Sequence, residues 1–354
     1  MKKVTIFAFT LIGVLSLQAQ TFPNKEWSYQ QDPDLDGWNT NKSKKFHRYL
    51  TDSTYITGFL VIHKGKIVFE YGDTYENSYI ASCRKSVLAL LMGKYVDDGK
   101  IDLNKNLDEL GMEDVNTLLP VEKKATIKDL ISSRSGIYIK GSNKGDYSEY
   151  SPKRGTKEPG KFWLYNNWDF NVSGAIFEQE TGKNIYDEVQ SQLAETLEME
   201  HWNRQLQKKY GDERVSKFPA YHMWFSTRDM ARIGLLMLRD GKWKSKQVIS
   251  ESWIKEVLKE RTSYQEINHN VPIHENLDTD FAYGYMWWLW KNVEDKRLEN
   301  GYSALGALGQ SITVFPKIDV VIAFKTKSTY GRFNSLQAQV GVLKKAVRIY
   351  ERTN

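Results

Sequence analysis

Ser82 and Lys85, a serine and a lysine three residues apart, are the residues of this chain best suited to covalent catalysis. They stand where a helix is predicted to begin, and positions i and i+3 of a helix lie on the same face. Lys85 could therefore take the proton of the Ser82 hydroxyl, which would give the nucleophile its own base. The pair predicts acyl transfer through a covalent serine intermediate.

The same spacing occurs at Ser252 and Lys255, and the surrounding sequence separates the two pairs. Ser252 opens an amphipathic, heavily charged segment, where we interpret the serine as a helix N-cap and the lysine as part of a solvated face. Ser82 instead precedes the apolar run 86–93, which predicts a helix buried on most sides. Burial disfavours the charged form of a lysine, so we expect the pKa of Lys85 to fall far enough for it to act as a base.

Strands are expected near both ends of the chain, with a mixed, helix-leaning and loop-rich middle. A helix is predicted from about 170 to 180, a second after an N-cap at Ser226, and a last one over about 335–352. The expected strands are 56–63, 67–71, 311–315 and 320–324. This order predicts an α+β fold, in which the N- and C-terminal segments complete one antiparallel sheet flanked by helices.

The chain has 354 residues, 40% of them apolar, which is enough for a sizeable core. Residues 1–20 have the positive, apolar and small-residue layout of a secretory signal peptide, so we expect an exported protein, periplasmic or secreted. The apolar stretch is short for a membrane span, and no stable membrane anchor is expected. We expect one domain over 21–354, with an α/β part at about 45–95 and 225–354 and a mainly helical part at about 96–224.

Charge and cysteine content exclude several classes of function. Loss of Lys2 and Lys3 with the signal peptide would lower the formal charge from +6 to +4, which is mild for a chain with 27% charged residues. The basic stretch 42–48 is interrupted and is typical of a solvated helix face, so no nucleic-acid partner is expected. Cys83 is the only cysteine, which excludes an internal disulfide. It points about 100° around the helix from Ser82, which predicts a small buried residue rather than a second nucleophile.

A serine nucleophile also needs a second proton-handling group and N–H donors for the oxyanion. Tyr165 and Asn167 form a Tyr-x-Asn pattern before a predicted helix, and a phenol can relay protons between nucleophile and leaving group. The turn 306–310 is rich in glycine, which lets a backbone N–H approach a reacting carbonyl. No Gly-x-Ser-x-Gly pattern is present, which argues against an α/β-hydrolase.

Taken in order, the Ser-x-x-Lys pair at 82–85, the Tyr-x-Asn pattern at 165–167 and the turn 306–310 resemble the three active-site elements of the serine β-lactamase and penicillin-binding-protein family. The resemblance covers roughly residues 45–350 and is greatest to class C β-lactamases and to the related esterases and 6-aminohexanoate-dimer hydrolases. It implies the β-lactamase/DD-peptidase fold and a reaction without a metal or organic cofactor.

The resemblance also implies a role for each position of the three elements. Ser82 would form the acyl-enzyme after activation by Lys85, and Tyr165 would shuttle the proton toward the leaving group. The backbone N–H groups of Ser82 and Ala307 would make the oxyanion hole. Contacts to the substrate or its oxyanion are expected from Asn167, Gly306 and Ala307.

The third element departs from the family pattern. The β-lactamases and transpeptidases of the family have Lys-Thr-Gly there, and its cation helps to bind a substrate carboxylate, whereas residues 303–306 read Ser-Ala-Leu-Gly. Lys325 belongs to a similar stretch, but that stretch lacks the glycine and follows a different strand. We therefore expect a neutral ester or amide as substrate, either a small molecule or peptide-like.

Two alternatives remain beside an exported esterase or amidase. One is D-alanyl carboxypeptidase or β-lactamase activity. The other is a non-catalytic protein that binds penicillin or a cell-wall fragment.

Aromatic residues and histidines offer further candidates. His222 could line the cleft, although a structural role is expected, and His269 and His274 are five apart without the pattern of a metal site. Most tryptophans are packing residues, and each of those near the motifs could instead touch substrate. These are Trp163, Trp168, Trp287 and Trp288.

Overall fold

The computed structural model describes residues 20–272 and 277–352. The signal peptide expected over 1–20 therefore lies outside the described residues, except for its last position. None of the helices in the described ranges is long and apolar enough to cross a membrane.

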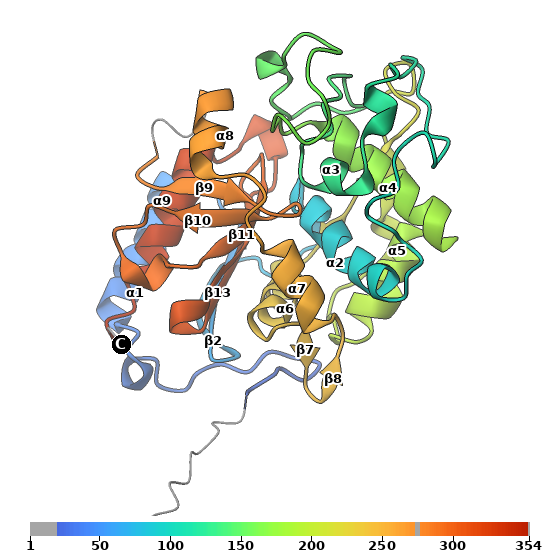
Figure 1. Ribbon diagram of the computed structural model, residues 1–354. Helices are drawn as coiled ribbons and strands as arrows, with labels where there is room; N and C mark the ends of the chain where they lie inside the picture. Colours follow the sequence, from blue (N-terminus) through green and yellow to red (C-terminus); the bar gives the residue numbers. More distant parts are fainter. Residues whose placement is uncertain (1–19, 273–276, 353–354) are drawn as a thin grey trace, which may run out of the picture.

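A seven-stranded antiparallel sheet forms the centre of the molecule, in the order β2-β1-β13-β12-β11-β10-β9 (Figure 1). The N-terminal hairpin pairs with the C-terminal strand, with Phe59 opposite Phe324. This confirms that the two ends of the chain complete one sheet. The strands are β1 (Gly58–His63), β2 (Lys66–Gly72), β9 (Asp280–Tyr283), β10 (Trp288–Lys291), β11 (Tyr302–Gly306), β12 (Gln310–Phe315) and β13 (Val320–Lys325).

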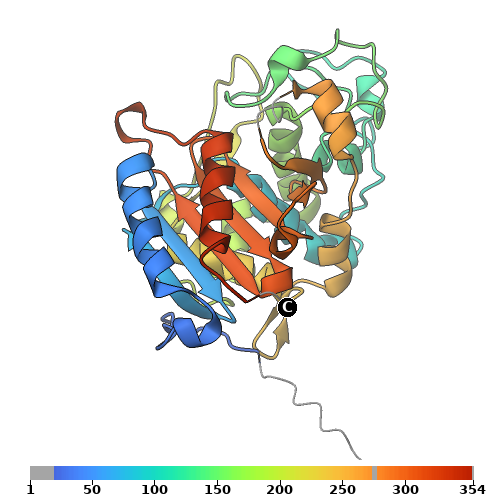
Figure 2. The same cartoon turned by 90° about the vertical axis from the view of Figure 1, so that its left-hand side faces the viewer.

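Helices cover both faces of this sheet. Figure 2 shows α1 (Thr40–Ser53) and α9 (Leu336–Val347) on one face. On the other face α6 (Thr227–Leu238) packs against β13, β12 and β1, and α2 (Cys83–Asp97) packs against β11 and β12. The sheet is therefore shielded on both sides, and the predicted α+β class is confirmed.

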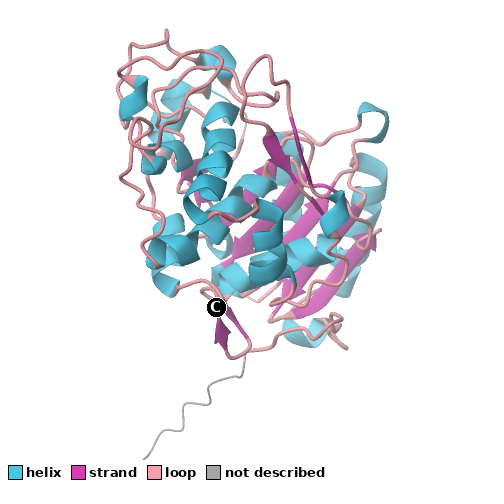
Figure 3. Cartoon of the chain, turned by 90° about the vertical axis from the view of Figure 1, so that its right-hand side faces the viewer, coloured by secondary structure: helices cyan, strands magenta, loops and turns pink. Residues whose placement is uncertain are grey.

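Figure 3 shows a group of helices and loops to one side of the sheet, and five further α-helices occur in the described residues. They are α3 (Ile127–Ile131), α4 (Asn167–Thr181), α5 (Ile185–Glu188), α7 (Glu251–Val257) and α8 (Tyr264–Asn270). Helix α4 packs against α2, and loops make up much of the chain between α2 and α6. The arrangement places the start of α2 between the sheet and α4.

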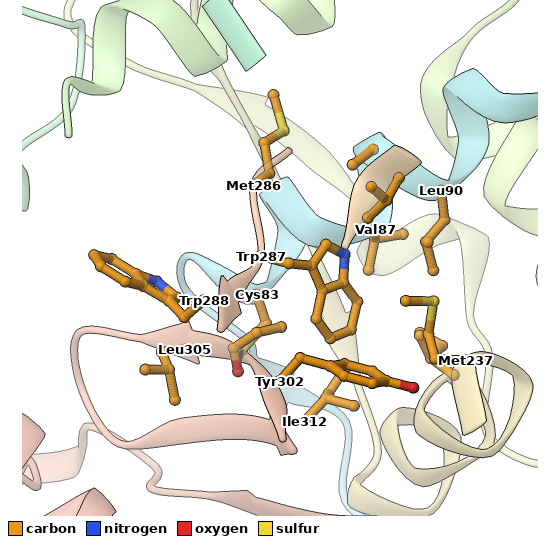
Figure 4. Packing of buried hydrophobic residues seen from close by; sticks show 14 of the residues in the cluster. Cys83, Val87, Leu90, Met237, Met286, Trp287, Trp288, Tyr302, Leu305 and Ile312 are labelled. Carbon is orange, nitrogen blue, oxygen red and sulfur yellow. Dashed lines mark hydrogen bonds between the residues drawn. The ribbon is translucent and has the colours of Figure 1, made fainter. Parts of the chain in front are cut away.

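Helix α2 is buried on all sides, as its apolar run predicts. Every residue from Cys83 to Gly93 is buried. Figure 4 shows Cys83 and Val87 of this helix packed with Trp287, Tyr302 and other residues of the sheet and α6. The Cys83 thiol lies 3.4 Å from the Ala304 carbonyl oxygen, and burial raises its pKa above the ordinary value. Cys83 is therefore a core residue, as expected.

Several predicted boundaries are confirmed and others are wrong. The Ser226 hydroxyl accepts the Asp229 N–H at the start of α6, which confirms that cap. Helix α4 begins three residues before the predicted start, because the Asn166 side chain caps it by accepting the Trp168 N–H. The last helix ends at Val347 rather than near residue 352. The basic stretch 42–48 forms a largely exposed part of α1, as predicted.

The N-cap assigned to Ser252 is wrong by two residues. Helix α7 begins at Glu251, and the Ser250 side chain accepts the Trp253 N–H. Ser252 therefore lies inside the helix. Lys255 is exposed and pairs with Glu251 at 2.6 Å, as expected for a solvated face.

Candidate active site

Ser82 stands directly before α2, at a sharp entry into the helix. The preceding residue, Ala81, has φ = +48°, a left-handed conformation that costs a residue with a Cβ about 1–2 kcal/mol. Ser82 is partly exposed, whereas the next residues of the helix are buried. The backbone therefore presents the Ser82 hydroxyl at the surface of a cavity while Cys83 turns into the core.

Lys85 is 1% exposed, and its amine lies between two polar oxygens and two rings. Its Nζ is 2.7 Å from the Tyr165 hydroxyl and 2.7 Å from Asn167 Oδ1. It also lies 4.1 Å and 4.3 Å from the ring centroids of Tyr165 and Phe170. Among the described residues, the groups that accept from the amine are neutral, so no carboxylate in hydrogen-bond contact stabilises its charged form.

Burial is the main reason that the pKa of Lys85 lies well below its ordinary value. The neighbouring Arg84 cation lowers it further, and the carboxylate of Asp146 opposes both effects. An amine whose pKa is lowered in this way can accept a proton near neutral pH. The burial expected for Lys85 from the sequence is therefore present.

Tyr165 connects the serine and the lysine. Burial raises the pKa of its phenol above the ordinary range, and a hydrogen bond with the Ser82 side chain acts in the opposite direction. The phenol is consequently protonated at neutral pH. Tyr165 thus accepts a hydrogen bond from Lys85 and lies beside Ser82, and it brings together side chains from two separate segments.

A cavity of about 250 Å³ opens above these side chains. It lies between the start of α2, a loop before α4, the strands β9 and β10, the turn after β11, and α9. Its lining comprises Ser82, residues 145–147, Tyr165, Phe281, Trp288, residues 305–307, Leu336 and Gln339. Among the described residues that line it, none is a lysine, arginine or histidine, and Asp146 is the one carboxylate.

The oxyanion positions expected from the sequence meet at this cavity. Ser82, Gly306 and Ala307 all line it. Within the described residues, neither the Ser82 N–H nor the Ala307 N–H donates to another protein group. Two backbone donors are thus available beside the serine hydroxyl, one from each side of the cavity.

Asn167 holds Lys85 in place from the first turn of α4. Its Oδ1 accepts from the lysine, and its Nδ2 donates to the Lys144 carbonyl at 3.1 Å. Its backbone N–H donates to Asp146 at 3.1 Å. Asn167 therefore joins the helix, the lysine and the loop that carries Asp146.

The four tryptophans near the motifs have different surroundings. Trp288 lines the cavity, and its ring stacks on Tyr165 with centroids 5.6 Å apart. Trp163 and Trp287 are fully buried, and Trp168 is held in the core by a 2.7 Å hydrogen bond to Asp114. Only the first of these is placed to touch a ligand in this cavity.

The remaining candidates lie away from the cavity lining. His222 bonds the Tyr79 hydroxyl at 2.8 Å, and burial lowers its pKa to about 4. Lys325 donates to the carbonyls of Glu76 and Phe225, at 2.6 and 2.7 Å, so it does not supply the cation missing from the third element. His269 is in α8, and its possible partner His274 lies outside the described residues. No cluster of three metal-binding side chains occurs in the described part of the chain.

Sequence reasoning missed several residues of the lining. Asp146 and Tyr147 lie on a loop without a recognisable motif, and Phe281 comes from a strand that was not predicted. Gln339 comes from the last helix. The tyrosines and tryptophans around β9 and β10 were the one available signal, and it did not distinguish lining residues from core residues.

Comparisons with known proteins agree with this geometry. The model of the Beta-lactamase family matches residues 57–343. A Bacillus anthracis structure described as a 6-aminohexanoate-dimer hydrolase is 20% identical, with a TM-score of 0.65 over 91% of this chain and 86% of that one. A Mycobacterium bovis β-lactamase structure is 15% identical, with a TM-score of 0.59 over 86% and 97% of the two chains.

Among curated proteins, the teichoic acid D-alanine hydrolase of Staphylococcus aureus is 26% identical over 195 residues, which are 48% of this chain and 47% of that protein. The match thus spans about half the length of that relative. The family model covers most of this chain, including the segments 82–85, 165–167 and 303–310. The chain belongs to the β-lactamase family of serine hydrolases.

Proposed function

We propose that this protein is an exported serine hydrolase that cleaves an ester or amide bond through an acyl-serine intermediate. The arrangement of Ser82 and Tyr165 on the wall of one cavity, with Tyr165 hydrogen-bonded to the buried Lys85, carries this proposal. The signal-peptide pattern at residues 1–20 supports export.

In the acylation step, Ser82 Oγ attacks the carbonyl carbon and its proton passes to Lys85, directly or through Tyr165. The oxyanion forms between the N–H groups of Ser82 and Ala307, a type of contact worth about 3–4 kcal/mol per donor. When the intermediate collapses, the bond to the leaving group breaks, and that group takes the proton back. The acyl group remains on Ser82.

In the deacylation step, water attacks the acyl-serine and gives a proton to the same amine and phenol. The ester bond to Ser82 then breaks, the serine regains its proton, and the acid leaves. The scheme requires an uncharged Lys85 at the start of both half-reactions, and burial lowers its pKa in that direction. Asn167 acts through the lysine and is a positioning residue in this scheme.

The lining of the cavity supports a neutral or cationic substrate. No cation among the described lining residues can meet a substrate carboxylate, and Lys325 is engaged elsewhere. The small volume of about 250 Å³ suits a short acyl group. Both features favour an esterase or amidase over hydrolysis of β-lactams, which carry a carboxylate.

A second candidate is hydrolysis of D-alanyl esters, and the curated relatives carry the name teichoic acid D-alanine hydrolase. The observation that favours it is Asp146, which lines the cavity and accepts the Asn167 N–H but has no ion-pair partner within the described residues. Aromatic rings beside a carboxylate are suited to an ammonium group, and an alanyl ester presents one.

The proposal is tested by hydrolysis of p-nitrophenyl esters by the purified protein. Ser82→Ala should abolish hydrolysis and labelling by a fluorophosphonate probe. Ser252→Ala is the matched control, because Ser252 has the same spacing to a lysine but is exposed on α7, and this variant should keep full activity. Hydrolysis by the wild type no faster than by Ser82→Ala, across a broad ester panel, refutes the enzyme. A stable adduct without turnover would instead indicate a binding protein.

Substrate choice is tested with matched pairs. An alanyl ester and its uncharged propionyl analogue should react at different rates if D-alanyl esters are the substrate, and Asp146→Asn should remove the difference. Nitrocefin should be hydrolysed slowly or not at all. Sequencing the N-terminus of the mature protein tests export, which predicts a start near residue 20.

A further inference from the structure

Two basic residues, Arg84 and Lys85, lie side by side in the first turn of α2, and each is 1% exposed. Burying one cation is costly, and burying two adjacent cations is more so. Lys85 has a place in the proposed reaction. Arg84 does not line the cavity and takes no part in the steps above.

The α4 side chains that accept hydrogen bonds from Arg84 and Lys85 are neutral amides. Asn167 and Asn171 stand one helical turn apart, and their side-chain oxygens accept from Lys85 at 2.7 Å and from Arg84 at 3.2 Å, respectively. Their Nδ2 groups donate to the loop before α4, at the Lys144 carbonyl and at Asn143 Oδ1. These bonds fix both oxygens toward α2.

Arg84 has no carboxylate partner among the described residues. Its Nε and Nη1 lack hydrogen-bond acceptors there, and its guanidinium lies 4.7 Å from the ring centroid of Tyr221. An arginine remains charged even when buried. The start of α2 therefore holds a permanent positive charge that no counter-ion within the described residues neutralises.

We propose that Arg84 is a positioning residue. The positive charge of its guanidinium keeps the neighbouring Lys85 in the unprotonated form. Two like charges whose partners on α4 are neutral amides repel each other, and the weaker base loses its proton. Lysine is the weaker base. This inference rests on the proposed function, in which Lys85 must be uncharged to accept the serine proton.

The other titratable groups near Lys85 are neutral, with the exception of Asp146. Tyr165 and Cys83 are protonated and neutral, because burial raises the pKa of each. Tyr147, whose ring contacts Tyr165, is neutral for the same reason. Within the described residues, Asp146 is the carboxylate that acts on Lys85, and it favours the charged lysine. Arg84 and Asp146 thus shift the pKa of Lys85 in opposite directions.

The test is the pH profile of kcat/KM with an uncharged ester, whose acidic limb reports protonation of Lys85. Arg84→Gln should move this limb to higher pH, so that the rate measured on the limb falls about 10-fold, the size of effect that one nearby charge produces. Asp146→Asn should move the limb in the opposite direction.

Asn171→Asp provides a variant that keeps Arg84 in place. The new carboxylate would neutralise the guanidinium and should also move the limb to higher pH. An NMR titration of the Lys85 side chain, assigned with Lys85→Met, gives the same comparison without any activity. Unchanged titration of Lys85 in both Arg84→Gln and Asn171→Asp overturns the inference. If the wild type shows no hydrolysis that depends on Ser82, the proposed function is overturned instead. The NMR titration would still decide whether Arg84 affects the pKa of Lys85.

Discussion

Replacing Gly93 by alanine should destabilise the protein, although alanine is the better helix former. Gly93 lies near the end of α2, where α7 packs against it. A Cβ at this position would lie 2.3 Å from Cδ1 of Trp253 and 2.8 Å from its Cγ and Nε1. The indole is 2% exposed and donates to the Ala89 carbonyl at 2.8 Å, so it cannot retreat without losing that hydrogen bond.

The magnitude follows from three contributions. Alanine gains about 1 kcal/mol over glycine in a helix interior. Forcing a methyl group into a packed site costs about 1–3 kcal/mol, and the lost hydrogen bond costs about 1 kcal/mol more. We therefore expect Gly93→Ala to lower the free energy of unfolding by about 1–3 kcal/mol.

Urea denaturation at constant m-value measures this change. Gly341→Ala is the matched control, because Gly341 lies in α9 and no atom stands within 4 Å of the point that its new methyl group would occupy. This substitution should stabilise the protein by about 0.5–1 kcal/mol. If Gly93→Ala proves as stable as Gly341→Ala, the close packing of α7 on the helix that carries Ser82 and Lys85 is refuted.

Three further predictions concern the site and the scaffold. Tyr165→Phe keeps the ring that stacks on Trp288 but removes the hydroxyl. The kcat with an activated ester should therefore fall about 10²–10⁴-fold, while thermal stability changes little. A kcat within about threefold of the wild-type value would exclude a proton relay through Tyr165. Thr126→Ala removes a side-chain oxygen that accepts the Asp129 N–H at the start of α3, and calorimetry should show a loss of about 1 kcal/mol. Burial lowers the pKa of His63 to about 4, below the value of about 6.5 in an unfolded chain. The unfolded state therefore binds the extra proton between these values, and stability present above pH 6.5 should decline by up to about 3 kcal/mol as the pH falls to 4. His63→Phe should remove that decline in denaturation curves measured across this range, and an unchanged pH dependence would contradict the assignment.

Local patterns predicted the parts of the site that lie within one turn of a helix or one hairpin. Ser82 and Lys85 share a helix start, and the apolar run after them required burial, so their placement follows from helix periodicity. The two hairpins at the ends of the chain were predicted from strands that adjoin tight turns. The cap at Ser252 was predicted wrongly because Ser250 offers the same side chain two residues earlier.

Other features were outside the reach of local patterns. Strands β9 and β10 are short and largely buried, so they show no alternation of polar and apolar residues. Asp146 lies on a loop that has no motif, and it reaches the cavity because Asn167 and the backbone of α4 hold that loop. Trp288 and Trp163 both lie among aromatic residues near the motifs, so the sequence does not distinguish them. Their different positions relative to the cavity depend on how β10 packs.

The sequence by itself determined the order of the three active-site elements, the burial of the helix that begins at Ser82, and the absence of a cation from the third element. Each depends on residue type and on neighbours within a few positions. The tertiary structure alone decided which phenol meets Lys85, which rings and carboxylate line the cavity, and that Arg84 is buried without a counter-ion among the described residues. These depend on contacts between residues far apart in the chain, such as the 221 positions between Cys83 and Ala304, which arise only when the sheet and α4 close around α2.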